Sequence, residues 1–255
     1  MFKRFMSLIL AFILILSTSS SALADTNSNE LWYVQKDGDN KTYLQNSKTG
    51  DKIVEAVSFD DAGNLVPVDL VEYASMLNNQ PVINQTSSLL KDAQLTDTPL
   101  QNSTNSTNST IPPVTVREYN ETGAFRTTGG VEKCTADVVG PANLTYGNSI
   151  GTSDAFNYQF NITAEIKKII KAGASFTWVD SSTSNTNFSL TYQIPAGKIG
   201  YVTFQPYLNY TYGKIREVVF VNNVIISDNS YLANATSPVK LSNGFTDGIF
   251  ALHTN

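Results

Sequence analysis

The sequence predicts a mainly β protein whose C-terminal domain is a β-sandwich. The strongest observation is a strict alternation that starts at Phe156, with apolar residues at even positions up to Ile166 and polar residues at the odd positions between them. A period of two is typical of a strand with one buried face. The second observation is the number of short apolar runs separated by Gly, Pro, Asn and Asp, which is typical of a sandwich.

The N-terminus predicts export. Two basic residues precede an apolar run at 5–16, and Ala22 and Ala24 form the small-x-small pattern of a signal-peptidase site. A membrane-spanning helix needs roughly 20 apolar residues, and this run is shorter. We therefore expect residues 1–24 to be a signal peptide, the mature protein to be secreted, and no stable integral membrane span to remain after cleavage.

Residues 25–83 are predicted to form a small β-rich N-terminal module. Three β-like runs at 31–35, 41–45 and 52–59 are separated by Asp-Gly and Gly-Asp turns, which predict a β-meander. Apolar residues at positions 70, 71, 74 and 77 then have the spacing of a helix. A module of this size is expected to be only marginally stable alone.

Residues 84–113 separate this module from the rest of the chain. They are mostly polar, include three consecutive Asn-Ser-Thr units at 102–110, and end in Pro112 and Pro113. Such a composition buries too little apolar surface to offset the entropy of ordering the backbone, so we expect a disordered linker. Residues 114–255 are then long enough for one β-sandwich domain.

The patterns within residues 114–255 predict strands, one short helix and several turns. The helix is expected where Ile166, Ile169 and Ile170 share one side, and a strand follows it where Ala174 and Phe176 alternate with polar residues. The predicted elements are a strand at 156–163, a helix at 164–172, a strand at 174–179, a turn at 180–187, a strand at 188–194, a turn at 195–198, and strands at 201–213, 216–221 and 223–227.

Charge and cysteine content narrow the partners and the compartment. Without residues 1–24 the chain has 15 Lys and Arg against 22 Asp and Glu, a formal charge of −7. An acidic protein gains nothing from counterion release, so nucleic acid is not expected as a partner. Cys134 is the one cysteine, and we expect a buried small hydrophobic residue there. A single thiol in a secreted chain favours bacterial export.

The sequence contains no recognisable catalytic motif, and we expect no enzyme activity, no catalytic residue, no cofactor and no metal site. His253, the one histidine, lies close to the C-terminus, where chains fray, so a Ser-His-Asp or Cys-His site is not expected. Asp37 and Asp39 resemble the start of a calcium loop, but Lys41 and Lys48 occupy two of the ligand positions. A two-carboxylate glycosidase stays open, because its acids need only meet in space.

Two segments carry a resemblance to known proteins. Gly140 to Tyr146, and the run IPAGKIGYVTFQPYLNYTYG at 194–213, resemble secreted β-rich proteins of Gram-positive bacteria whose role is unknown. Those proteins pair a polar-alternating strand and an Ile/Val-Pro-Ala-Gly-Lys turn with an aromatic-rich strand. The resemblance covers about 134–213 and implies kinship without a biochemical activity.

A second similarity is to aerolysin-like β-pore-forming toxins of the epsilon-toxin group. Those toxins have long Ser/Thr-rich strands followed by a Val-Pro-x-Gly-Lys-like turn, matched here by Ile194, Pro195, Gly197 and Lys198. The resemblance implies a membrane-inserting hairpin at 174–194, where Asp180 is the one charged residue between Ala172 and Ile194. Each strand of such a hairpin needs about 9 to 11 residues, and these are shorter. An ordinary sandwich hairpin with one wet face is the alternative.

Aromatic residues crowd the segment 201–212, and a solvent-facing subset is a candidate binding surface. Tyrosine offers an apolar face and a polar tip, which suits stacking on a sugar or resting on a cell-wall polymer. The candidates are Tyr201, Tyr207, Tyr210 and Tyr212. Because side chains alternate along a strand, core packing is the alternative for about half of them.

The sequence therefore predicts a secreted non-enzymatic protein that acts by binding at the cell surface or in the extracellular medium. The ligand class expected is a cell-wall polymer, a glycan or a membrane. The alternative function is an aerolysin-like β-pore former that oligomerises on membranes.

Overall fold

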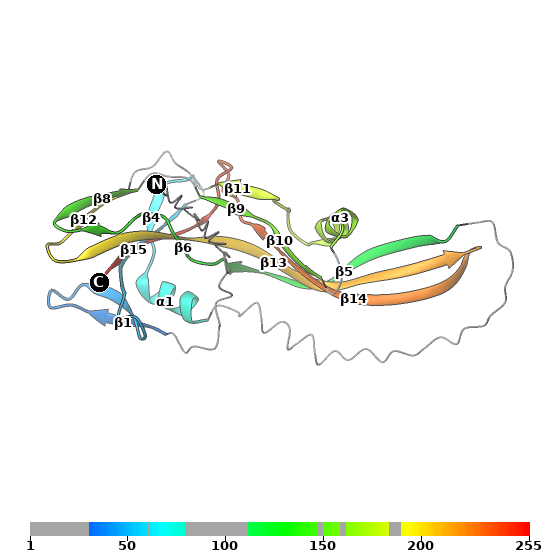
Figure 1. Cartoon of the computed structure of the whole chain (residues 1–255), viewed down its shortest axis with the longest axis horizontal. Coiled ribbons are helices and arrows are strands. Elements are labelled where there is room, and N and C mark those ends of the chain that lie inside the picture. Colours follow the sequence, from blue (N-terminus) through cyan, green and yellow to red (C-terminus); the bar gives the residue numbers. More distant parts are fainter. Residues whose placement is uncertain (1–30, 61, 80–111, 147–149, 159–161, 184–189) are drawn as a thin grey trace, which may run out of the picture.

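The structure is a computed structural model that describes residues 31–60, 62–79, 112–146, 150–158, 162–183 and 190–255. It is mainly β, which confirms the predicted class. The predicted signal peptide with Ala22 and Ala24, and nearly all of the predicted linker, lie outside the described residues. Figure 1 shows an elongated molecule, with a broad body at one end and a narrow extension at the other.

One antiparallel sheet of eleven strands runs through the molecule, and its strands come from both the N-terminal and C-terminal parts of the chain. Neighbouring strands along its main path are β1 (Trp32–Lys36), β2 (Thr42–Asn46), β3 (Lys52–Phe59), β15 (Gly248–Thr254), β13 (Ile199–Val221), β14 (Val224–Pro238) and β10 (Ala155–Tyr158). Strand β4 (Leu65–Pro67) pairs with β3, while β5 (Val114–Thr128), β6 (Glu132–Lys133) and β7 (Val138–Val139) pair with β13.

Two smaller sheets complete the β structure. Strand β8 (Ala142–Tyr146) pairs with β12 (Leu190–Ile194), and β9 (Gly151–Ser153) pairs with β11 (Ser181–Thr183). Tyr146 and Ile194 from the first of these pack with Phe204 and Phe250 of the main sheet in one buried cluster. This cluster packs the small sheet against one face of the main sheet. The layering is local, and a β-sandwich across the whole C-terminal domain stays a prediction.

The N-terminal strands belong to the main sheet. The predicted meander forms as β1, β2 and β3, with Asn40 and Gly50 at positive φ in the turns that join them. Strand β3 then pairs with β15 from the far end of the sequence, with Val57 opposite Phe250. The Ser58 hydroxyl also donates to the Gly248 carbonyl across this junction, at 2.9 Å. The predicted N-terminal module and C-terminal domain therefore share one sheet.

Helix α1 (Leu70–Asn78) covers the other face of the body, as the spacing of its apolar residues predicts. Asp69 caps its N-terminus by accepting from the Val71 amide at 2.7 Å. Tyr73 is buried against Leu44 and Ile249 of the sheet. The helix thereby ties the N-terminal strands to β15, which lies in the C-terminal part of the chain.

Three unusually long strands, β5, β13 and β14, build the extension in Figure 1, which we call the finger. Strand β13 is one continuous strand of 23 residues, so the prediction of separate strands at 201–213 and 216–221 is wrong. The predicted break falls at Gly213, where β13 continues and the register of its pairing with β5 shifts. A β-carbon at Gly213 would lie 2.2 Å from the Asn120 carbonyl oxygen, so the close approach of the two strands requires glycine.

Helix α3 (Ala164–Gly173) packs on the base of the finger and confirms the predicted helix at 164–172. Thr163 caps it by accepting from the Ile166 amide, at 3.3 Å. Ile166 and Ile170 are buried against Tyr119 and Ile215. The small side chains of β14 at this point, Ala233 and Ala235, complete the same cluster.

The strand predicted at 174–179 is wrong, because this segment is irregular. Its backbone is satisfied by a side chain instead of a neighbouring strand: the Val179 amide donates to the Ser237 hydroxyl at 2.8 Å, and the same hydroxyl donates to the Val179 carbonyl at 3.0 Å. The alternating aromatic residues stack on one another, with the Phe176 and Trp178 ring centroids 5.6 Å apart.

Candidate binding cleft

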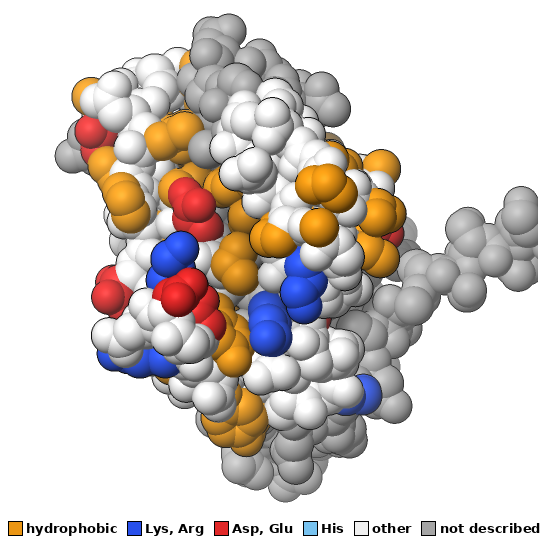
Figure 2. Space-filling view, turned by 90° about the vertical axis from the view of Figure 1, so that its left-hand side faces the viewer, with side chains coloured by type: hydrophobic (Ala, Val, Ile, Leu, Met, Phe, Trp, Pro, Cys, Tyr) orange, Lys and Arg blue, Asp and Glu red, His pale blue; other side chains and the backbone are white. Residues whose placement is uncertain are grey.

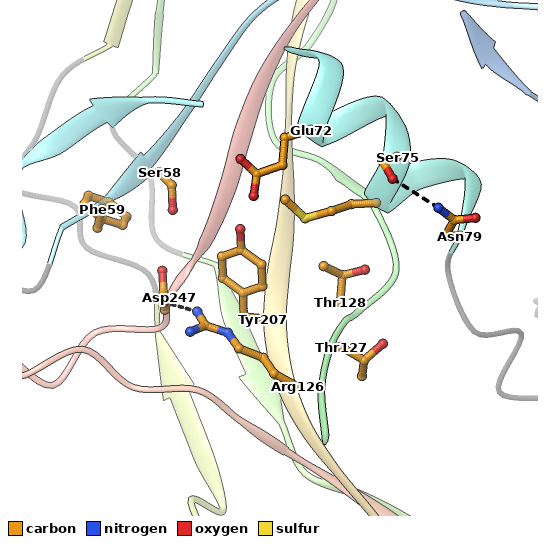
Figure 3. A pocket seen from close by; sticks show the side chains of 11 residues that line it. Ser58, Phe59, Glu72, Ser75, Asn79, Arg126, Thr127, Thr128, Tyr207 and Asp247 are labelled. Carbon is orange, nitrogen blue, oxygen red and sulfur yellow. Dashed lines mark hydrogen bonds and ion pairs between the residues drawn. The ribbon is translucent and has the colours of Figure 1, made fainter. Parts of the chain in front are cut away.

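A cleft of about 680 Å³ opens between helix α1 and the strands β3, β5 and β13 (Figure 3). It lies where the N-terminal and C-terminal parts of the chain meet, and both supply its walls. Its lining combines hydroxyl and amide side chains with two aromatic rings, one thioether and three charged groups. The lining residues are Ser58, Phe59, Glu72, Ser75, Met76, Asn79, Arg126, Thr127, Thr128, Tyr207 and Asp247.

Tyr207 lies in the cleft and is held by Arg126. Tyr207 on β13 pairs with Thr128 on β5, which places Arg126, two residues earlier on β5, diagonally across from it. The Arg126 guanidinium lies over the Tyr207 ring, 4.1 Å from its centroid. Arg126 also forms an ion pair with Asp247, whose side chain is nearly buried. The charge of Arg126 is thus already matched within the protein.

The Tyr207 hydroxyl points toward the Glu72 carboxylate in Figure 3. Burial raises the pKa of this hydroxyl above its ordinary value. Arg126 opposes the rise, and the negative charges of Asp247 and Glu72 add to it. The phenol therefore stays protonated at neutral pH and can donate a hydrogen bond.

Hydroxyl and amide groups surround this tyrosine. On α1 the Asn79 amide donates to the Ser75 hydroxyl at 3.1 Å, and Thr127 and Thr128 contribute hydroxyls from β5. Such groups can donate and accept hydrogen bonds in turn. Together with two aromatic rings and a matched ion pair, they suit a ligand that is polar and carries little net charge.

The four predicted binding aromatics do not form one surface. Tyr207 lies in the cleft, whereas Tyr210 is only 2% exposed and packs against the Phe125 ring. Tyr201 stacks on His253 with ring centroids 4.6 Å apart, and its hydroxyl donates to Asp51 at 2.6 Å. Tyr212 is half-buried on the finger, 6.1 Å from Tyr210. Of the four, Tyr207 alone lines the cleft.

The prediction that His253 lies on a frayed tail is wrong. His253 is 5% exposed on β15, which lies between β3 and β13 inside the main sheet. Its Nδ1 is 2.7 Å from an Asp51 carboxylate oxygen, and its Nε2 is 2.9 Å from the Thr203 hydroxyl. Thr203 is 4% exposed, so this acid–histidine–hydroxyl set is a buried hydrogen-bond network beneath the surface.

The same network perturbs Asp51. Burial alone would raise the pKa of this carboxyl, but hydrogen bonds from His253 and Tyr201 outweigh it and hold the pKa below its ordinary value. Cys134 is half-buried at the edge of the core, and burial raises the pKa of its thiol to about 12. The thiol form therefore dominates at neutral pH.

The end of the body opposite the finger carries acidic and basic side chains intermixed with apolar ones (Figure 2). No group of three or more His, Cys, Asp or Glu side chains within the described residues is placed to hold a metal ion. No helix in the described part of the chain is both long enough and apolar enough to cross a membrane. Comparisons of this chain with protein-family models, with curated proteins and with solved structures found no match.

Proposed function

We propose that this protein is an exported, non-enzymatic binding protein whose cleft around Tyr207 holds a glycan. The observation that carries the proposal is the arrangement of Tyr207, fixed by Arg126 and surrounded by hydroxyl and amide groups. An aromatic ring beside groups that both donate and accept hydrogen bonds matches the alternating apolar and hydroxyl surfaces of a sugar.

The size and charge of the cleft support the same ligand class. Ligand pockets typically have volumes of roughly 300–1,000 Å³, and this cleft has about 680 Å³. Because Arg126 is paired with Asp247, a strongly anionic ligand would meet no unmatched cation there. Glu72, which also lines the cleft, then remains as an acceptor for sugar hydroxyls.

The chemistry of the cleft favours binding over turnover. Asp247 is engaged by Arg126, an arrangement that fixes the arginine over Tyr207. The acid–histidine–hydroxyl set lies elsewhere and is buried, out of reach of a substrate. A two-carboxylate hydrolase acting through Glu72 and Asp247 is the competing interpretation. The two interpretations differ in whether the glycan is cleaved during incubation with the protein.

The test uses the mature chain, residues 25–255, on an array of bacterial and host glycans, followed by calorimetry on the strongest ligand. We expect Tyr207→Ala to weaken binding at least ~10-fold, because it removes both the apolar area that the ring buries and an aromatic contact worth about 0.5–1.5 kcal/mol beyond that area, and 1.4 kcal/mol is tenfold. Tyr33→Ala is the matched control, because Tyr33 is exposed on β1 outside the cleft.

The glycan should be recovered intact after incubation. Hydrolysis that is lost in Glu72→Gln would overturn the non-enzymatic part of the proposal. Failure of the mature chain to bind any glycan, or equal affinities for the wild type and Tyr207→Ala, would overturn the proposed ligand site.

A β-pore former is the second candidate, and the length and edges of the finger favour it. Strand β5 pairs with β13 alone among the described strands, and β14 meets β10 only over residues 233–236. Long strands with open outer edges can pair with another copy of the chain. Dye release from liposomes with SDS-resistant oligomers is the expected result for a pore former, and an absence of release from every membrane tested would count against it.

A further inference from the structure

The free end of the finger carries no charge, and most of its exposed side chains are apolar. We call this end the tip, residues 114–116 and 218–227, which include no Asp, Glu, Lys, Arg or His. Its exposed apolar residues are Val114 (57%), Val116 (50%), Val224 (62%), Ile225 (51%) and Ile226 (55%). Thr115 and the two turn residues, Asn222 and Asn223, are also exposed and are uncharged. Figure 1 shows the tip projecting away from the body, at the far end of β13 and β14.

The tip is apolar on both faces of its sheet. Paired residues share a face, so Val114, Phe220 and Ile225, which are opposite one another across the three strands, form one row. Successive residues alternate between faces, which places Val221 and its partner Val224 on the other side. The three consecutive residues 224–226 are all exposed. A tip that is apolar on both faces suits immersion in an apolar medium better than contact with one face of a protein.

The charge-free region is deep enough to enter the interfacial layer of a bilayer. The first charged residue on β13 is Glu217, four residues from the turn, which at about 3.3 Å per residue is a depth of about 13 Å. Interfacial anchors bury roughly 5–10 Å into the headgroup and acyl boundary. A strand that spans a bilayer needs about 9–11 residues, so the tip is long enough to anchor but too short to cross.

The charges directly behind the tip are paired. Arg117 Nε donates to Glu217 at 2.6 Å, and the Arg216 guanidinium donates to both carboxylate oxygens of Asp228 at 2.9 and 2.6 Å. No excess of positive charge is therefore available at the base of the tip to select anionic lipid. This balance points to zwitterionic bilayers and to a binding energy that comes from apolar burial.

We propose that the tip anchors the protein in the interfacial region of a lipid bilayer, with Val224, Ile225 and Ile226 among the acyl chains. This site is separate from the Tyr207 cleft and goes beyond glycan binding. The anchor inserts the end of an existing hairpin and requires no refolding of the finger.

The test is flotation of the mature chain with vesicles of phosphatidylcholine alone. We expect the wild type to float with the vesicles, and Ile225→Ser combined with Ile226→Ser to reduce the bound fraction at least tenfold. Val139→Ser is the matched control and should bind as the wild type does, because Val139 is 67% exposed on β7 in the body. Unchanged circular dichroism establishes that the double variant is folded.

A second measurement reports the depth of the tip. In a background that carries Trp32→Phe and Trp178→Phe, the emission of Val224→Trp should shift to shorter wavelength on vesicles and be quenched by brominated acyl chains. Val139→Trp in the same background should show neither change. Wild-type protein that does not float, or a double variant that floats as well as the wild type, would overturn the proposal. Self-association that the double variant abolishes, without any vesicle binding, would assign the tip to a second copy of this chain and equally overturn it.

Discussion

Ile249→Ala tests whether the N-terminal and C-terminal parts of the chain fold as one unit. Ile249 is 0% exposed on β15 and packs in one cluster with Leu44 and Ile53 of the N-terminal strands and Tyr73 of α1. The substitution removes three buried carbon atoms and leaves a cavity. Changes of this kind cost about 2–5 kcal/mol, and we expect about 3 kcal/mol here because the site is fully enclosed.

Two tryptophans report on the two parts separately. Trp32 lies in β1, with its ring edge-on to His253 at 6.0 Å between centroids. Trp178 lies near α3, where it donates to Asp154 at 3.0 Å. Trp178→Phe leaves Trp32 as the probe of the N-terminal strands, and Trp32→Phe leaves Trp178 as the probe of the region around the finger.

The assay is urea unfolding followed by fluorescence and by far-ultraviolet circular dichroism in each single-tryptophan background. A slope of about 3 kcal/mol per molar urea converts the expected loss into a midpoint shift of about 1 M. Because β3, β15 and β13 are neighbours in one sheet, we expect Ile249→Ala to shift the midpoints of both fluorescence transitions equally, and the midpoint of the dichroism transition by the same amount. A shift confined to Trp32 would refute this reasoning and show that the N-terminal strands unfold independently.

Three further predictions follow from individual residues. The pKa of Asp51 in the folded protein lies below its unfolded value of about 3.9, so the ionised carboxylate stabilises the fold above about pH 4, and this stabilisation is lost as pH falls through the folded pKa. Asp51→Asn should therefore lower Tm at pH 7 and make the fall of Tm below pH 4 less steep. Asn222 and Asn223 have φ of 52° and 61°, so alanine at each should cost about 1 kcal/mol in urea unfolding, whereas glycine should be close to neutral. The Cys134 thiol has a pKa raised to about 12 by burial, so disulfide-exchange labelling at pH 8 should be at least ~100-fold slower in the native protein than in urea, and equal rates would contradict that environment.

Local sequence patterns predicted the local structure well. The turn residues around Asp37 and Gly50 correctly predicted the meander, and the Ile166–Ile170 spacing correctly predicted a helix. These elements depend on interactions within a few residues, which periodicity and turn chemistry report directly. At 174–179 the same reasoning failed, because Val179 takes its backbone hydrogen bonds from Ser237, 58 residues away.

Long-range partners were outside the reach of these patterns. Nothing near Val57 indicates that it lies opposite Phe250, and this pairing is what places His253 inside a sheet instead of on a tail. The cleft has the same limitation: Tyr207 was predicted as a binding aromatic, but Arg126 precedes it by 81 residues and carries no motif. Arginine and acidic residues are common on surfaces, and only long-range pairing brings these groups together. The β5–β13 register places Arg126 beside Tyr207, and the Tyr207 amide, which donates to the Asp247 carbonyl at 2.9 Å, holds Asp247 next to both.

The exposure of the tip is another property that the sequence pattern does not predict and the topology determines. The apolar run around Val224 was predicted as an ordinary strand, and alternation gives no sign that both faces lie in solvent. That property comes from the length of β13, which carries the turn beyond the reach of α3 and the body.

The most direct test of the account is the affinity of the strongest array glycan for the mature chain at pH 7, measured by calorimetry for the wild type, Tyr207→Ala and Tyr33→Ala. The account predicts that Tyr207→Ala binds at least ~10-fold more weakly while Tyr33→Ala is unchanged. Equal affinity in all three proteins would contradict it.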